Sequence, residues 1–215
     1  MQVFDPQQDV QVVIRSLPHW SQTGTISFIT WRTGDSIPLS VYHRWLAERR
    51  RFLQRLHVDP DADDWKQQFE RIEPLLRNGF RRIMTNRWNR QLDTCYGECV
   101  LGRSELSKIV ADSLLHFDGE RYELTDFVVM PNHVHLLAAF PNEESMLLQC
   151  ESWKRFTATK INRLLQRKGR FWQADGFDHL VRTTEQFEYL RAYIADNPRR
   201  ARLSAGQYVH YSKHL

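Results

Sequence analysis

The chain has 215 residues, of which 41% are hydrophobic, and this is enough for one domain with a buried core. Thirty Lys and Arg against 26 Asp and Glu leave a formal charge of only +4, so net charge by itself is weak evidence for a nucleic-acid partner. The sequence contains neither a signal peptide nor eighteen consecutive apolar residues, which predicts a cytoplasmic protein without a membrane partner.

The cysteine pattern favours free thiols in a reducing compartment. Three cysteines form an odd and sparse set, whereas a secreted domain held by disulfides would carry more of them in pairs. Cys95 and Cys99 lie close together, but no second Cys or His pair follows them with zinc-ligand spacing. We therefore expect neither a structural zinc site nor disulfides, and Cys150 is interpreted as an ordinary thiol.

Hydrophobic periodicity predicts alternating strands and helices after an N-terminal arm over residues 1–24. The expected elements are a strand at 26–31, two amphipathic helices between 41 and 86, a helix at 104–117 capped by Ser104 and stopped at Asp118-Gly119, strands at 122–130 and 133–140, a helix at 145–167, a hairpin-like segment at 170–182 that turns at Asp175-Gly176, and a helix from Thr184 to Asp196 that stops before Pro198. This order predicts an α+β fold, a ferredoxin-like split βαβ core with an antiparallel sheet, followed by a C-terminal helix. We expect a single domain over residues 1–215, with a helical insertion over residues 41–102.

Two histidines in the second of the paired strands form a candidate metal site. His133 and His135 are separated by one residue, so both imidazoles project from the same face of a strand. The flanking residues are apolar, and buried imidazoles without a function would each need hydrogen-bond partners. Imidazole is a common ligand of divalent metals, so we interpret the pair as metal ligands, although one satisfied core histidine beside one exposed histidine is the alternative.

The terminal helix carries a candidate nucleophile. Tyr189, Tyr193 and Asn197 form one row at helical spacing, separate from the buried stripe of the same helix. Periodicity alone leaves either tyrosine as the candidate. Asn197 precedes Pro198 and offers a side-chain carbonyl as a third metal ligand, and Tyr193 lies one turn before it. A metal beside this phenol would help it to attack phosphorus, because a phenol with an ordinary pKa near 10 is a poor nucleophile at neutral pH.

Four segments in this order resemble the single-tyrosine HUH transposases, and especially the REP-associated tyrosine transposases. They are VVMPNHVHLL, SWKRFTATKIN, FWQADGFDHLVR and YIADNPRRARL. The resemblance spans about Gly24 to Leu203. It implies an HUH transposase-like domain that cleaves and rejoins single-stranded DNA, generally beside a hairpin, through a covalent phosphotyrosine.

The resemblance also implies roles for individual residues. His133 and His135 match the two histidines of the HUH motif, Tyr193 matches the nucleophile and Asn197 matches the third ligand of a divalent metal, Mg or Mn. We accordingly expect single-stranded or hairpin DNA as the partner, a location on the nucleoid, and a monomer or homodimer. The helical insertion is longer than the corresponding segment of the smallest family members, and it either extends the DNA-binding surface or supports the core.

Basic residues after the histidine strands are candidates for DNA contacts. Seven basic residues against one acidic residue give the segment 151–172 a local charge of +6, and Lys154 and Arg155 belong to it. His179 and Arg182 match a recurrent family segment. Regular strand alternation would place these last two side chains on opposite faces. A solvated helix surface is the alternative for the basic segment.

Two other functions are compatible with the same residues. The first is a domesticated protein that binds DNA repeats without cutting them. The second is a metal hydrolase in which the histidines activate water and Asp178 or Asp196 serves as the base. A covalent protein–DNA adduct separates the transposase from both.

Overall fold

The computed structural model describes residues 11–14, 18–21, 24–93, 95–174 and 176–213, and these residues fall into two compact units. Residues up to Ser36 and from Glu98 onward form an α+β unit, and Ile37–Gly97 form a helical unit. Each unit is described by itself. No helix among the described residues is long and apolar enough to cross a membrane.

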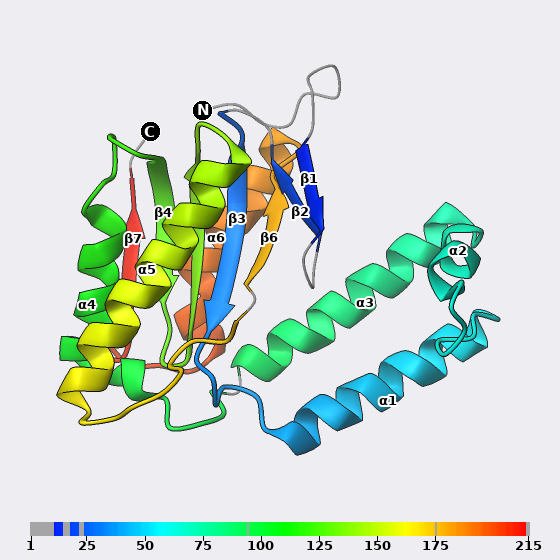
Figure 1. The fold of residues 1–215 in the computed structure, drawn as a ribbon, viewed down its shortest axis with the longest axis horizontal. Coiled ribbons are helices and arrows are strands. Elements are labelled where there is room, and N and C mark those ends of the chain that lie inside the picture. Colours follow the sequence, from blue (N-terminus) through cyan, green and yellow to red (C-terminus); the bar gives the residue numbers. More distant parts are fainter. Residues whose placement is uncertain (1–10, 15–17, 22–23, 94, 175, 214–215) are drawn as a thin grey trace. The chain divides into compact units, whose positions relative to one another are not determined.

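The α+β unit is built on a five-stranded antiparallel sheet with the strand order β6-β3-β5-β4-β7 (Figure 1). Its strands are β3 (Ile26–Arg32), β4 (Glu123–Val129), β5 (His133–Ala139), β6 (Phe177–Leu180) and β7 (Val209–Ser212). The first four strands, with α4 (Ser104–Leu115) and α5 (Glu143–Leu164), reproduce the ferredoxin-like order that the sequence predicts. A 3-10 turn, η1 (Val100–Gly102), leads into α4.

Helices cover both faces of this sheet, with α4 and α5 on one face and α6 (Thr184–Arg200) on the other (Figure 1). Alternation along β5 divides its side chains accordingly: Val134 and Leu136 join the core under α4 and α5, whereas Leu137 joins the core under α6. Because β5 is central, all seven of its residues are buried. The face shared with Leu137 is therefore a dry environment between the sheet and α6.

The helix starts have identifiable local causes. At α5, the Asn142 side chain accepts a hydrogen bond from the Ser145 N–H at 2.8 Å, and at α6 the Thr183 hydroxyl accepts one from the Gln186 N–H at 3.1 Å. The expected cap Ser104 is wrong, because Ser104 is already the first residue of α4 and no side chain caps that helix. The packing of α4 against the sheet compensates for the missing cap.

The structure departs from the sequence expectations before and after the core. Gln11–Ile14 (β1) and Pro18–Ser21 (β2) form an antiparallel pair within the segment predicted as an arm. The strand β7 was not predicted, and it extends the sheet beside β4. The segment predicted as a hairpin does not pair with itself in this way. Trp172 forms an isolated β-bridge with Thr33, which directly follows β3, and β6 pairs with residues 27–30 of β3. Asp175 lies outside the described residues.

The helical unit contains three helices where two were predicted: α1 (Leu39–Arg55), α2 (Trp65–Glu70) and α3 (Pro74–Asp93). Pro74 explains the difference, because proline lacks the N–H that a continuing helix needs but suits the first position of a new one. The unit has its own small core, formed by Leu53, Val58, Phe69, Phe80 and Met84.

A polar network fixes α6 to the edge of the sheet. The Arg191 Nε donates to the buried Asp126 carboxylate of β4 at 3.0 Å, and a terminal nitrogen of Arg191 reaches Ser212 of β7 at 3.1 Å. The Ser212 hydroxyl also donates to Asp126 at 2.6 Å. One carboxylate thus ties together β4, β7 and α6.

Arg191→Met should lower the free energy of unfolding by about 3 kcal/mol, because it leaves the Asp126 carboxylate buried without its cationic partner. Urea unfolding at neutral pH measures the change. Lys108→Met is the matched control: it breaks the exposed pair with Asp112 on α4, and should cost less than about 0.5 kcal/mol. Equal losses in the two variants would contradict a stabilising role for the network.

Candidate functional site

The two histidines of β5 share the sheet face that α6 covers. Both imidazoles are fully buried, and their ring centroids lie 4.7 Å apart. In the antiparallel register His135 lies opposite Thr30 of β3 on one side and Val128 of β4 on the other. The prediction that both rings project from one face of a buried strand is thus met by the geometry.

Each imidazole is oriented through its Nδ1 atom. His133 Nδ1 lies 2.8 Å from the Asn132 side-chain oxygen, which can only accept, so Nδ1 carries the proton. His135 Nδ1 lies 2.6 Å from the Thr30 hydroxyl, which can also accept. The Nε2 lone pair of His133 is then available to a ligand, and that of His135 is available when its Nδ1 donates to Thr30, as in metal sites whose histidines are held by outer hydrogen bonds.

Burial keeps both rings neutral. It lowers the pKa of His133 to about 3, with the Arg32 charge acting in the same direction and a polar contact with Asn197 opposing it. Burial also holds the pKa of His135 well below its ordinary value, helped by His133 and Arg200. Neutral imidazole is the form that binds metal, so no proton has to be displaced at pH 7.

The helix α6 brings Tyr193 and Asn197 to these rings. The Tyr193 ring meets the His135 ring edge to face at 5.3 Å, and both rest on Phe28 of β3, at centroid distances of 5.4 Å from His135 and 6.1 Å from Tyr193. Asn197 is fully buried. Tyr189 is 66% exposed, so the structure separates the two tyrosines that periodicity left open.

Four polar atoms at this point lack a hydrogen bond within the described part of the chain: Nε2 of His133, Nε2 of His135, and the side-chain oxygen and nitrogen of Asn197. Leaving a buried polar group unsatisfied costs about 1–3 kcal/mol. Two imidazole nitrogens and an amide oxygen are suitable ligands for a divalent metal. The donor set therefore fits the cation that the sequence predicts.

No group of three or more His, Cys, Asp or Glu side chains gathers as a metal site anywhere in the described ranges. A site built on the two histidines and Asn197 would have an amide as its third donor. Asp196, which a water-activating mechanism would need, forms an ion pair with Arg199 at 2.5 Å, and the Asp178 side chain lies outside the described residues. Tyr193, by contrast, contacts the His135 ring directly.

The end of α6 corrects a sequence expectation. The helix was predicted to stop before Pro198, but it continues to Arg200 with Pro198 inside it. Pro198 and Asn197 are both buried, and the packing of this last turn outweighs the loss of one backbone hydrogen bond to the proline. The helical geometry at Asn197 keeps its amide one turn from Tyr193, facing the histidines.

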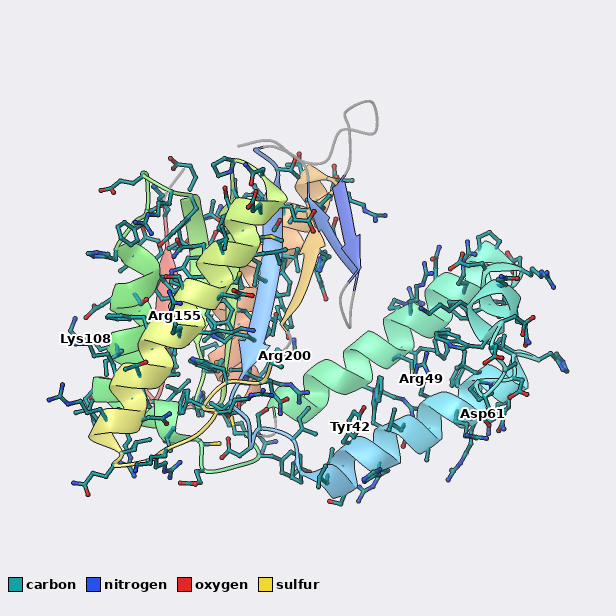
Figure 2. The ribbon with its side chains drawn as sticks, in the orientation of Figure 1. Tyr42, Arg49, Asp61, Lys108, Arg155 and Arg200 are labelled. Carbon is teal, nitrogen blue, oxygen red and sulfur yellow. The ribbon has the colours of Figure 1, made fainter. Side chains whose placement is uncertain are left out.

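The predicted DNA-contact residues have different surroundings. Arg155 is exposed on α5, on the sheet face opposite α6, as its labelled side chain in Figure 2 shows. Lys154 is partly buried, and its ammonium donates to the Ala174 carbonyl at 3.0 Å. It holds the loop before β6, where Gly176 approaches β3 so closely that a Cβ would lie 3.1 Å from the Thr30 carbonyl oxygen.

His179 and Arg182 do not follow regular strand alternation, because β6 ends at Leu180. His179 packs beside Phe28 at a centroid distance of 5.3 Å, and burial, followed by the nearby Arg182 charge, lowers its pKa to about 4. A DNA contact by His179 would therefore be made by a neutral ring. Arg182 is exposed. Binding of DNA by all four residues stays a prediction.

Three residues that shape the site were not predicted from the sequence. Asn132 could have been recognised from its place before His133, in the turn that joins the two strands. Thr30 and Phe28 carry no such signal, because their contacts depend on the pairing of β3 with β5.

The fold and the site define a class of protein. It is an α+β protein in which a central antiparallel sheet and a covering helix bring two histidines, an amide and a tyrosine together. Residues 103–197 match the family model described as "Transposase IS200 like", and this segment contains all four residues. This segment of the chain is therefore similar to IS200-like transposases, in agreement with the expected resemblance to insertion-sequence transposases.

A solved structure of a REP-associated tyrosine transposase bound to a REP hairpin aligns with 87% of this chain and 74% of that chain, at 14% sequence identity and a TM-score of 0.43. No curated protein matches the sequence.

The buried histidines predict acid destabilisation. In the unfolded chain imidazoles take up protons near pH 6.5, whereas His133 and His179 stay neutral in the folded chain to about pH 3 and pH 4. The unfolded state thus binds more protons between pH 6.5 and 4, so stability is highest above pH 6.5 and falls as the pH drops through this window. His179→Gln should reduce the slope by about 1.4 kcal/mol per pH unit.

Urea unfolding in EDTA at several pH values measures this slope. His43→Gln, at an exposed position of α1, is the control and should leave the slope unchanged. An unaltered slope in His179→Gln would show that this imidazole is not the buried neutral group described above.

Proposed function

We propose that the protein cleaves and rejoins single-stranded DNA, with Tyr193 as the covalent nucleophile and a divalent metal held by His133, His135 and Asn197. The observation that carries this proposal is the convergence of two buried neutral Nε2 atoms and a buried amide beside the Tyr193 ring. When bound, the metal supplies Lewis-acid polarisation of the scissile phosphate. Two nitrogen ligands favour Mn over Mg, since Mg prefers oxygen.

The protein's own residues orient the reaction. Phe28 and His135 fix the plane of the Tyr193 ring, and α6 holds the phenol beside the histidines. In the reaction the phenol loses its proton, its oxygen forms a bond to phosphorus, and the bond from phosphorus to the departing strand oxygen breaks. That oxygen takes up a proton and leaves as a hydroxyl. The new ester retains the energy of the phosphodiester, so rejoining needs no ATP.

The substrate follows from the family resemblance of the motifs: single-stranded DNA, beside a hairpin formed by a palindromic repeat. Cleavage at such repeats would make the protein an endonuclease. We expect it to act on the nucleoid, as a monomer or a homodimer. Binding without cleavage is the competing function, and the first experiment below distinguishes the two.

Tyr193→Phe should abolish the covalent adduct because it removes the attacking oxygen but keeps the ring. The assay incubates the purified protein with Mn²⁺ and a pool of single-stranded hairpins, and follows the denaturation-resistant protein–DNA species by gel electrophoresis. Tyr189→Phe, on the same helix row but exposed, is the control and should form the adduct at the wild-type rate.

Two outcomes would reject the proposal. Adduct formation by Tyr193→Phe would assign the nucleophile elsewhere. Equal DNA binding by the wild type and Tyr193→Phe, with no adduct in either, would identify a DNA-binding protein without cleavage activity.

Asn132→Ala should weaken Mn²⁺ binding about 10–100-fold, because it removes the acceptor that orients His133 and fixes its proton on Nδ1. Calorimetric titration with Mn²⁺ without DNA measures the affinity. Asn162→Ala on α5, whose amide donates to the Gly169 carbonyl, is the control and should bind Mn²⁺ like the wild type. Unchanged Mn²⁺ affinity in Asn132→Ala would show that Asn132 does not orient His133 for the metal. Absence of Mn²⁺ binding by the wild type would reject the metal site.

A further inference from the structure

We infer that Arg32 and Arg200 form a phosphate-binding subsite that holds the DNA backbone on either side of the histidine pair and Tyr193. The inference rests on the proposed function and adds two residues to it. Both lie outside the segment that matches the transposase family, which runs from Arg103 to Asn197.

Arg32 is placed by the end of β3. In the antiparallel register it lies directly opposite His133, and directly opposed residues project from the same face of a sheet with Cβ atoms about 4.5–5.5 Å apart. Its carbonyl accepts the Gln173 N–H at 2.9 Å, and the next residue, Thr33, donates its N–H to the Asn132 carbonyl at 2.8 Å. One terminal nitrogen of Arg32 is buried. A guanidinium is therefore held on a rigid strand end beside the first histidine.

Arg200 is placed by the last turn of α6. It follows Tyr193 by two helical turns, and its guanidinium lies over the Tyr193 ring, 5.1 Å from the ring centroid. The side chain labelled Arg200 in Figure 2 is exposed, as a residue that meets DNA should be. A guanidinium stacked on an aromatic ring keeps its planar edge for a phosphate, whose two oxygens match that edge. The cation thus lies next to the proposed reacting phenol.

The charge balance of the α+β unit gives weight to the position of its cations. Its sequence, residues 1–36 and 98–215, contains 18 Lys and Arg and 18 Asp and Glu, so its formal charge is zero. In a unit without net charge, electrostatic attraction of a phosphodiester depends on where the individual cations lie. Asp196 is the single acidic residue between Tyr193 and Arg200 in the sequence, and Arg199 pairs with it.

Salt dependence of DNA binding tests the subsite without metal. Wild type, Arg32→Gln and Arg200→Gln are titrated in EDTA against a fluorescent single-stranded hairpin with random flanks, at several salt concentrations. Each substitution should weaken binding about tenfold and reduce the slope of log affinity against log salt by about 0.7, the value for one phosphate contact on a single strand.

Arg199→Gln is the matched control, because it removes the neighbouring arginine whose guanidinium is directed to Asp196 instead of the tyrosine. Its affinity and slope should equal those of the wild type. Arg200→Lys keeps the charge but not the planar edge, and should restore the slope but only part of the affinity. Urea unfolding shows whether each variant is folded. If Arg32→Gln is not folded, the test of the subsite depends on Arg200→Gln, because Arg200 is exposed.

The covalent-adduct assay separates this inference from the function on which it rests. If wild type forms the adduct while Arg32→Gln and Arg200→Gln keep the slope of Arg199→Gln, the subsite is overturned and the function stands. If wild type forms no adduct but the two variants lose slope, the tyrosine mechanism fails and the phosphate subsite is supported. Reduced slope together with slower adduct formation is the expected result.

Discussion

The structure depends on burying two uncharged imidazoles in the middle of an antiparallel sheet. Two hydrogen-bonding rings in an apolar layer are costly unless their polar atoms are satisfied. The pairing of β3 with β5 provides Thr30 for one ring, and the turn before β5 provides Asn132 for the other. These contacts use only the Nδ1 atoms, so the Nε2 atoms are directed toward α6.

The second requirement is that α6 lies in one register on the sheet. Apolar contacts through Leu190 and Ile194 bring the helix onto this face but are not directional. The ion pair of Arg191 with the buried Asp126 is directional, and it fixes both the rotation and the height of the helix. Tyr193 and Asn197 thus meet the histidines on rigid elements instead of loops, as a precise site requires.

The charge of the chain is unevenly divided, and this bears on the helical unit. The unit Ile37–Gly97 contains twelve basic and eight acidic residues, so it carries the whole formal charge of +4. Several of its arginines form ion pairs within the unit, including those of Arg50 with Asp61 and Arg87 with Glu48. With a core of its own, this unit is more than an extended loop, and its role in DNA binding stays a prediction.

The sequence by itself determined the strands and helices of the core and the two faces of β5, because strand and helix periods are local properties of the chain. It also placed His133 and His135 on one side of a strand. It could not decide between Tyr189 and Tyr193 by periodicity, predict β7, or show that the helix continues through Pro198. Those features depend on which surfaces meet: burial of the last turn keeps Asn197 helical, and only the β3–β5 register and the docking of α6 bring Thr30, Phe28, Arg32 and Arg200 to the histidines. Such contacts join residues far apart in the chain, and no local pattern records them.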